Sequence, residues 1–148
     1  MRLGRRLAFD PGSVRIGVAV CDPEGLLASS REAISAGDYE ALRAVVTEIE
    51  PVEIIVGLPI GLDGKEGQAA SRARAFAHDL STWSAAPIRL VDERLSTVQA
   101  QRGLHDQGRS VRQSRTMIDS ASAEVVLQHA LDAERALGQP PGEVFQAT

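Results

Sequence analysis

Three acidic residues are placed where a carboxylate could take part in chemistry. Asp10 and Glu93 each end an apolar run, and Asp119 lies near the start of a long helical pattern. An ionised carboxylate at the end of a buried strand is costly unless it is paired or bound to a metal ion. For Asp10 the alternative is a turn residue ahead of Pro11 and Gly12, because Asp favours such positions.

The surroundings of Asp119 support a functional role for this acid. Asp119, Ala123, Val126 and Ala130 follow one another at spacings of four, three and four residues, which places them on one helical face. The other three are small or apolar, so this face is expected to pack on a sheet, where an acid needs a positive partner. A partly exposed position favoured by the helix dipole is the alternative.

Carboxylates that converge from distant segments would form an oxygen-rich site for Mg²⁺ or Mn²⁺. Two such ions about 3.5–4 Å apart can activate water and stabilise the leaving oxygen in phosphodiester cleavage. Other chemistries fit less well. The three histidines and Cys21 lack zinc-ligand spacing, no serine lies in a G-x-S-x-G motif, and residues 59–66 lack two positions of a phosphate-binding loop.

The elements that must position these acids indicate a single α/β domain at 1–137. A three-strand antiparallel meander precedes alternating helices and strands, which predicts a mixed five-stranded sheet flanked by helices. We expect strands at 6–10, 15–21, 26–34, 54–56 and 87–91, and helices at 38–49, 69–80, 97–107 and 113–137. Gly57 is expected to stop the fourth strand, 58–67 to form a mobile loop, and 138–148 to form a flexible tail.

Composition narrows the class of protein further. The 148 residues include one cysteine, no apolar run long enough to cross a membrane and no signal-peptide pattern, so a cytoplasmic location is expected. The net charge of −4 argues against a protein that coats nucleic acid through bulk charge. Acidic residues gather at Glu48, Glu50 and Glu53.

A local group of basic residues is a candidate nucleic-acid contact. Four arginines flank the expected link between the last two helices, close in sequence to Asp119. For each of them the alternative is a solvated position in a charged loop. The predicted nucleic-acid-binding residues are Lys65, Arg94, Arg102, Arg109, Arg112 and Arg115.

Four short motifs resemble those of the YqgF/RuvX family. They are DPGSVRIGVA at 10–19, VGLP at 56–59, DERLST at 92–97 and IDSASA at 118–123. They occur in the family's order, and the resemblance extends over residues 3–137. It implies an RNase H-like fold related to Holliday-junction resolvases, and a cytoplasmic nuclease that helps to mature the 5′ end of 16S ribosomal RNA. By motif position, the family's acids fall on Asp10, Glu93 and Asp119.

The sequence therefore predicts a metal-dependent nuclease. Asp10 is expected to bind both of two Mg²⁺ or Mn²⁺ ions, with Glu93 and Asp119 binding one each. Asp92 is expected to lie outside this set, because adjacent strand residues point to opposite faces.

Alternatives stay open for the substrate and for the class of function. Structured RNA, the precursor of 16S rRNA, is the expected substrate, with association to the ribosome, and a branched DNA junction is the runner-up. A monomer and a homodimer are both compatible with the sequence. A non-catalytic nucleic-acid-binding module stays open as a different class, as does a sugar kinase or actin-like ATPase, whose folds need two such domains and a much longer chain.

Overall fold

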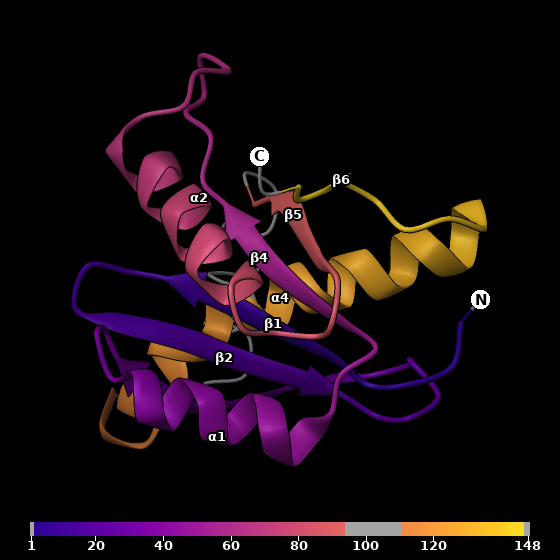
Figure 1. Ribbon diagram of the computed structural model, residues 1–148, viewed down its shortest axis with the longest axis horizontal. Coiled ribbons are helices and arrows are strands. Elements are labelled where there is room, and N and C mark those ends of the chain that lie inside the picture. Colours follow the sequence, from indigo (N-terminus) through magenta and orange to yellow (C-terminus); the bar gives the residue numbers. More distant parts are fainter. Residues whose placement is uncertain (1, 94–110, 147–148) are drawn as a thin grey trace.

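The computed structural model describes the backbone of residues 2–93 and 111–146, and the side chains of all these except 111–119. The elements are β1 (Arg6–Pro11), β2 (Arg15–Cys21), β3 (Ala28–Ser35), α1 (Tyr39–Ile49), β4 (Glu53–Leu58), α2 (Gln68–Ser81), β5 (Ile88–Asp92), α4 (Val111–Leu137) and β6 (Glu143–Val144). In this part of the chain, the strands form one mixed sheet in the order β3-β2-β1-β4-β5-β6 (Figure 1). The predicted α/β class, with a mixed sheet flanked by helices, is therefore confirmed.

The antiparallel half of the sheet consists of β1, β2 and β3, as the sequence predicts. In the turn between β1 and β2, the Gly12 backbone N–H donates to the Arg15 carbonyl oxygen at 2.9 Å. A Cβ atom at position 12 would lie 2.7 Å from that same oxygen, so the turn requires glycine. This turn fixes the register in which Asp10 faces Gly17 across the two strands.

The parallel half consists of β1, β4 and β5, whose carboxyl ends therefore lie at one edge of the sheet. β4 is buried along its whole length, as a central strand of a parallel sheet should be. The prediction that Gly57 stops this strand is wrong. Gly57 pairs with Val91 of β5, and β4 continues to Leu58.

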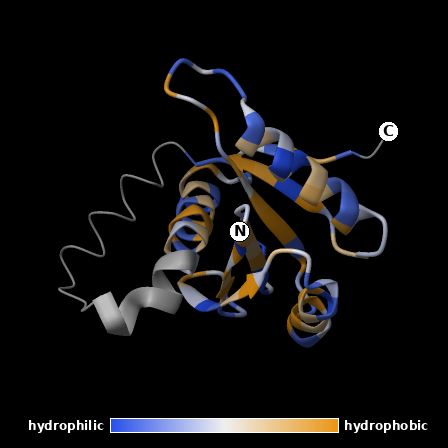
Figure 2. Ribbon diagram, turned by 90° about the vertical axis from the view of Figure 1, so that its left-hand side faces the viewer, coloured by the Kyte–Doolittle hydropathy of each residue, from blue (hydrophilic) through white to orange (hydrophobic). Residues whose placement is uncertain are grey.

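Helices cover both faces of the sheet, which gives three layers (Figure 2). On one face α1 and α2 pack against the sheet, and buried Leu42 and Phe9 belong to the same apolar cluster. On the other face α4 packs, and its Leu127 clusters with Ala8 of β1. Because successive strand residues point to opposite faces, Ala8 and Phe9 belong to different layers.

The described helices agree with the sequence prediction. The Asp38 Oδ1 atom accepts a hydrogen bond from the Ala41 backbone N–H at 3.1 Å, which caps the start of α1. At its other end, Glu50 adopts a left-handed conformation directly before Pro51. The helix predicted at 97–107 lies outside the described residues. None of the described helices combines the length and apolar character needed to cross a membrane.

The segment that follows α4 departs from the sequence prediction of a flexible tail. Residues Glu143–Val144 form β6, which pairs antiparallel with β5. The Phe145 backbone N–H donates to the Ile88 carbonyl oxygen at 2.8 Å, and the Phe145 side chain packs against the core. Gly142, with φ +81°, lets the chain pass against the Leu90 carbonyl group. The sheet therefore has a sixth strand beyond the five that were predicted.

A buried ionic cluster lies at the amino ends of the parallel strands. Glu134 of α4 accepts hydrogen bonds from Arg2 at 2.6 Å and from Arg6 at 3.1 Å. Glu53 accepts from Arg2 at 3.1 Å and from Arg89 at 3.0 Å. Glu53 is therefore a buried, paired residue and does not belong to an acidic surface with Glu48 and Glu50.

Cys21, the only cysteine of the chain, is buried at the end of β2. Its Sγ atom accepts a hydrogen bond from the Arg6 backbone N–H at 3.1 Å. Burial raises the pKa of the Cys21 thiol, which keeps it in the neutral form.

Candidate active site

Asp10 and Glu93 converge at the carboxyl edge of the parallel strands. Asp10 is the penultimate residue of β1, and Glu93 directly follows β5. β4 lies between these two strands, and the Glu93 backbone N–H donates to the Leu58 carbonyl oxygen of β4 at 3.2 Å. Figure 1 shows β1, β4 and β5 side by side.

Strand alternation explains why these two acids meet. Ala8 and Val91 both pack in the cluster beneath α4, and Asp10 and Glu93 each lie two residues further along. They therefore share the α4 face of the sheet. By the same alternation Asp92 is assigned to the opposite face, and the expectation that it lies outside the pair stays a prediction.

The two carboxyl groups share a hydrogen bond, in which protonated Glu93 donates to Asp10. Burial, the charge of Asp10 and this hydrogen bond raise the pKa of Glu93 to about 8. The pKa of Asp10 is also raised, chiefly by burial. Near neutral pH the pair therefore holds a proton where two negative charges would otherwise repel each other.

Gly57 provides the space that the pair occupies. A Cβ atom at position 57 would lie 2.5 Å from Glu93 Oε2 and 3.7 Å from Asp10 Oδ1. Any larger residue there would push at least one carboxylate away. Sequence reasoning treated Gly57 as the end of a strand and missed this role. The available signal was a glycine inside an apolar β-branched run, between two strands that end on acids.

α4 is bound to the sheet near the pair through Ser120. The Ser120 Oγ atom accepts from the Val18 backbone N–H at 3.1 Å and donates to the Arg31 carbonyl oxygen at 2.6 Å. Val18 follows Gly17, the cross-strand partner of Asp10. Asp119 immediately precedes Ser120 in α4, but its side chain is outside the described part of the structure.

The predicted basic residues are mostly outside the described part. Lys65 is exposed, in the connection between β4 and α2. Arg112 and Arg115 lie in α4, without described side chains, and the predicted contact through them stays a prediction. Residues Arg94, Arg102 and Arg109 lie in the undescribed segment 94–110.

The residues present fit a divalent cation. Asp10 and Glu93 supply only oxygen donors, which suit Mg²⁺ and Mn²⁺. The space beside Gly57 borders both carboxylates, because a Cβ atom there would lie 2.5 Å from Glu93 Oε2 and 3.7 Å from Asp10 Oδ1. A cation in that space would offset the repulsion between the two acids. Among the side chains that the structure describes, no group of three or more His, Cys, Asp or Glu residues forms a metal site. A three-ligand site at this edge would need Asp119 or another acid from outside that set.

Comparison with solved structures agrees with the fold. The protein of the structure entitled "T. thermophilus RuvC in complex with Holliday junction substrate" superposes with a TM-score of 0.57. The superposition covers 96% of this chain and 99% of that chain, at 12% sequence identity. At this identity the likeness shows a shared fold, the one that the sequence resemblance implied.

Comparison with protein sequences identifies the family. A protein of Streptomyces coelicolor named "Putative pre-16S rRNA nuclease" is 49% identical over 97% of this chain and 89% of its own length. A protein of Thermobifida fusca with the same name is 49% identical over 100% of this chain and 99% of its own length. The family model described as "RuvX: Holliday junction resolvase" matches residues 4–133. The chain therefore belongs to the RuvX family.

Proposed function

We propose that this chain is a nuclease that uses a divalent metal ion to hydrolyse phosphodiester bonds, and that its substrate is the 5′ end of precursor 16S rRNA. One observation of the structure carries the proposal. Asp10 and Glu93 meet at the carboxyl edge of the parallel strands, in a space that Gly57 leaves open. The names of the relatives support the choice of substrate.

Asp10 and Glu93 would hold Mg²⁺ or Mn²⁺, with Asp119 of α4 as the third ligand and two ions as the expected number. When bound, such ions activate a water molecule and stabilise the leaving oxygen. Asp10 lies on a strand paired on both sides, so its carboxylate is held rigidly. Glu93 must lose the proton that it shares with Asp10 before both groups can act as ligands.

The basic residues would hold the nucleic-acid backbone beside these acids. Lys65 and the arginines at 94, 102, 109, 112 and 115 are the proposed phosphate contacts. A precursor rRNA substrate also implies work in the cytoplasm, on the assembling ribosome.

The test is a single-turnover cleavage assay with a precursor 16S rRNA 5′ fragment in Mg²⁺ and in Mn²⁺. The variants Asp10→Asn, Glu93→Gln and Asp119→Asn should each lose cleavage by a factor of a thousand or more, because each removes a metal ligand. RNA binding by these variants should stay close to wild type. The matched control is Asp92→Asn, which removes the adjacent acid on the other face and should retain substantial activity.

Two results would contradict the proposal. Normal cleavage by Glu93→Gln together with an inactive Asp92→Asn would show that Asp92, and not Glu93, belongs to the active site. Normal cleavage by all four variants would move the active site elsewhere, and RNA binding without cleavage by the wild type would favour a binding module.

A four-way DNA junction is the second candidate substrate. The family model's description and the RuvC-like fold favour it. The same assay with a junction in place of the RNA decides between them, because metal-assisted cleavage is the same chemistry on either polymer.

A further inference from the structure

The connection between β4 and α2, residues 59–67, forms a hairpin in the region where the sequence predicts a loop. Ile60 and Glu66 form an isolated β-bridge. The Gly61 backbone N–H donates to the Lys65 carbonyl oxygen at 2.9 Å, and the Gly64 N–H donates to the Gly61 carbonyl oxygen at 2.8 Å. Gly64 has φ +80°, a conformation that suits glycine in a tight turn. We call these residues the 59–67 hairpin.

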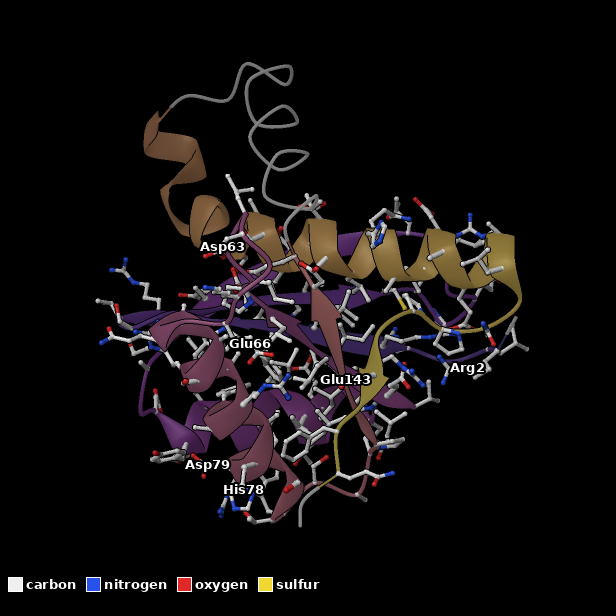
Figure 3. All side chains as sticks on the ribbon, turned by 90° about the horizontal axis from the view of Figure 1, so that it is seen from above. Arg2, Asp63, Glu66, His78, Asp79 and Glu143 are labelled. Atoms are coloured by element: carbon white, nitrogen blue, oxygen red, sulfur yellow. The ribbon has the colours of Figure 1, made fainter. Side chains whose placement is uncertain are left out.

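An arginine of α2 fixes the base of the 59–67 hairpin. Arg74 donates from Nε and Nη2 to the two carboxylate oxygens of Glu66, at 2.7 Å each. Arg74 Nη2 also donates to Glu143 of β6 at 3.1 Å. Figure 3 labels Glu66, from the 59–67 hairpin, and Glu143, from β6. Bidentate pairing sets an orientation as well as a distance, so Arg74 ties the Glu66 end of the hairpin to α2.

The tip of the 59–67 hairpin presents a leucine to solvent. Leu62 is 97% exposed, the largest exposed fraction among the large apolar side chains that the structure describes. An isolated exposed leucine is ordinary in itself. Leu62 differs because it lies on a hydrogen-bonded turn that also carries Asp63 and Lys65, where the Lys65 backbone N–H donates to Asp63 Oδ1 at 3.0 Å.

The 59–67 hairpin begins where the candidate active site ends. Leu58, the residue before it, accepts the hydrogen bond from the Glu93 backbone N–H. In Figure 1 the hairpin projects beyond the carboxyl end of β4. Beside it lies an open hollow of about 580 Å³, lined in part by Asp63, Lys65, Glu66 and Gln68. The hairpin therefore extends from the strand end that the Glu93 backbone contacts.

We propose that the 59–67 hairpin is a nucleic-acid wedge, in which Leu62 packs against an unstacked base and Lys65 pairs with a neighbouring phosphate. This inference rests on the proposed nuclease function and names the part of the substrate that the chain recognises, a boundary between paired and unpaired nucleotides. Apolar side chains such as leucine are known to insert between bases and to unstack them. A base at such a boundary costs less to unstack than one inside a duplex.

The probe is an RNA hairpin with a single-stranded 5′ extension that carries 2-aminopurine at the first unpaired position. Binding is measured without a divalent metal, so that no cleavage occurs, by anisotropy and by 2-aminopurine fluorescence, which rises when the base unstacks. The wild type should raise this fluorescence. Leu62→Ser should abolish the rise and weaken binding roughly tenfold, because the leucine loses its apolar contact.

The matched control is Leu137→Ser, which replaces another exposed leucine, 71% exposed at the end of α4. It should bind and unstack the probe as the wild type does. Lys65→Gln should keep the fluorescence rise but lower the slope of log affinity against log salt by about one unit. Circular dichroism and thermal unfolding should not distinguish Leu62→Ser from the wild type, since Leu62 makes no contribution to the core.

Equal fluorescence rises for the wild type and Leu62→Ser, or no rise with the wild type, would overturn the wedge. Cleavage of the same RNA in Mn²⁺ tests the nuclease function separately. Cleavage without an effect of Leu62 overturns only the wedge. Unstacking that depends on Leu62, without any cleavage, overturns only the nuclease function.

Discussion

The glycine between the two acids makes the candidate active site sensitive to a single methyl group. Gly57→Ala would place a Cβ atom 2.5 Å from Glu93 Oε2, so Glu93 must move. We expect metal-dependent cleavage to fall at least a hundredfold, because displaced catalytic groups lose their alignment. Titration calorimetry with Mn²⁺ should show weaker binding. Gly67→Ala is the control, since a Cβ atom there meets nothing within 4 Å, and it should bind Mn²⁺ normally.

At the scale of residues, the functional role of an acid can be predicted from sequence when that acid ends a local pattern such as an apolar strand. Asp10 and Glu93 could be paired in advance because each ends an apolar strand, and parallel strands bring such ends together. The role of Gly57 could not be predicted, since it depends on the side chains of Asp10 and Glu93, which the neighbouring strands position. Asp119 stays a prediction, because its side chain lies outside the described part of the structure.

Among the elements, α4 makes a buried hydrogen-bonded contact with the sheet through Ser120, in addition to its apolar packing. Ser120→Ala would remove the partner of the Val18 N–H and of the Arg31 carbonyl group, at a cost of about 1–3 kcal/mol in the free energy of unfolding. Because α4 also carries Asp119, we expect kcat to fall while RNA binding holds. Urea unfolding and single-turnover kinetics measure the two effects. A loss no larger than that of Ser122→Ala would contradict this role.

The added strand β6 makes the chain after α4 part of the fold. Deleting residues 139–148 would remove the Phe145 packing and expose one edge of β5. We expect Tm to fall by several degrees and aggregates to increase in size-exclusion chromatography, because an open sheet edge invites pairing with other chains. Glu143→Gln is the control, since it weakens only an exposed ion pair. A deletion variant as stable and monodisperse as this control would show that β6 adds nothing.

At the scale of elements, helices and the longer strands were predicted from local periodicity, and β2 was predicted at its observed bounds. β6 could not be predicted, because a two-residue strand has no periodic pattern. It forms through contacts of Phe145 and Gly142 with β5, which are distant in sequence.

Across the whole molecule, acid stability depends on the buried ionic cluster at the amino ends of the parallel strands. The hydrogen bonds from Arg2, followed by the charges of Arg2 and Arg6, lower the pKa of Glu134 to about 2. A carboxylate with a lowered pKa in the folded state stabilises that state above its ordinary pKa of 4.5, and this contribution is lost as pH falls toward 2.

We therefore expect Glu134→Gln to lower the free energy of unfolding at pH 7 by on the order of 3 kcal/mol. At pH 2 the difference from the wild type should largely disappear, because wild-type Glu134 is then protonated in part. Urea unfolding at both pH values measures this. Asp132→Asn, which changes an exposed acid of the same helix, should show no such dependence. The sequence could not predict the cluster, because its five members come from four distant segments.

The burial of Cys21 gives the protein an internal reporter of its own unfolding. A thiol with a raised pKa, enclosed at the end of β2, offers no thiolate to an alkylating reagent while the fold is closed. Labelling of the native protein by iodoacetamide should therefore proceed only through opening of the sheet, and mass spectrometry should show a rate that rises with urea. Immediate labelling in native buffer would contradict this. With no second cysteine in the chain, every labelled molecule records one opening event at a known position.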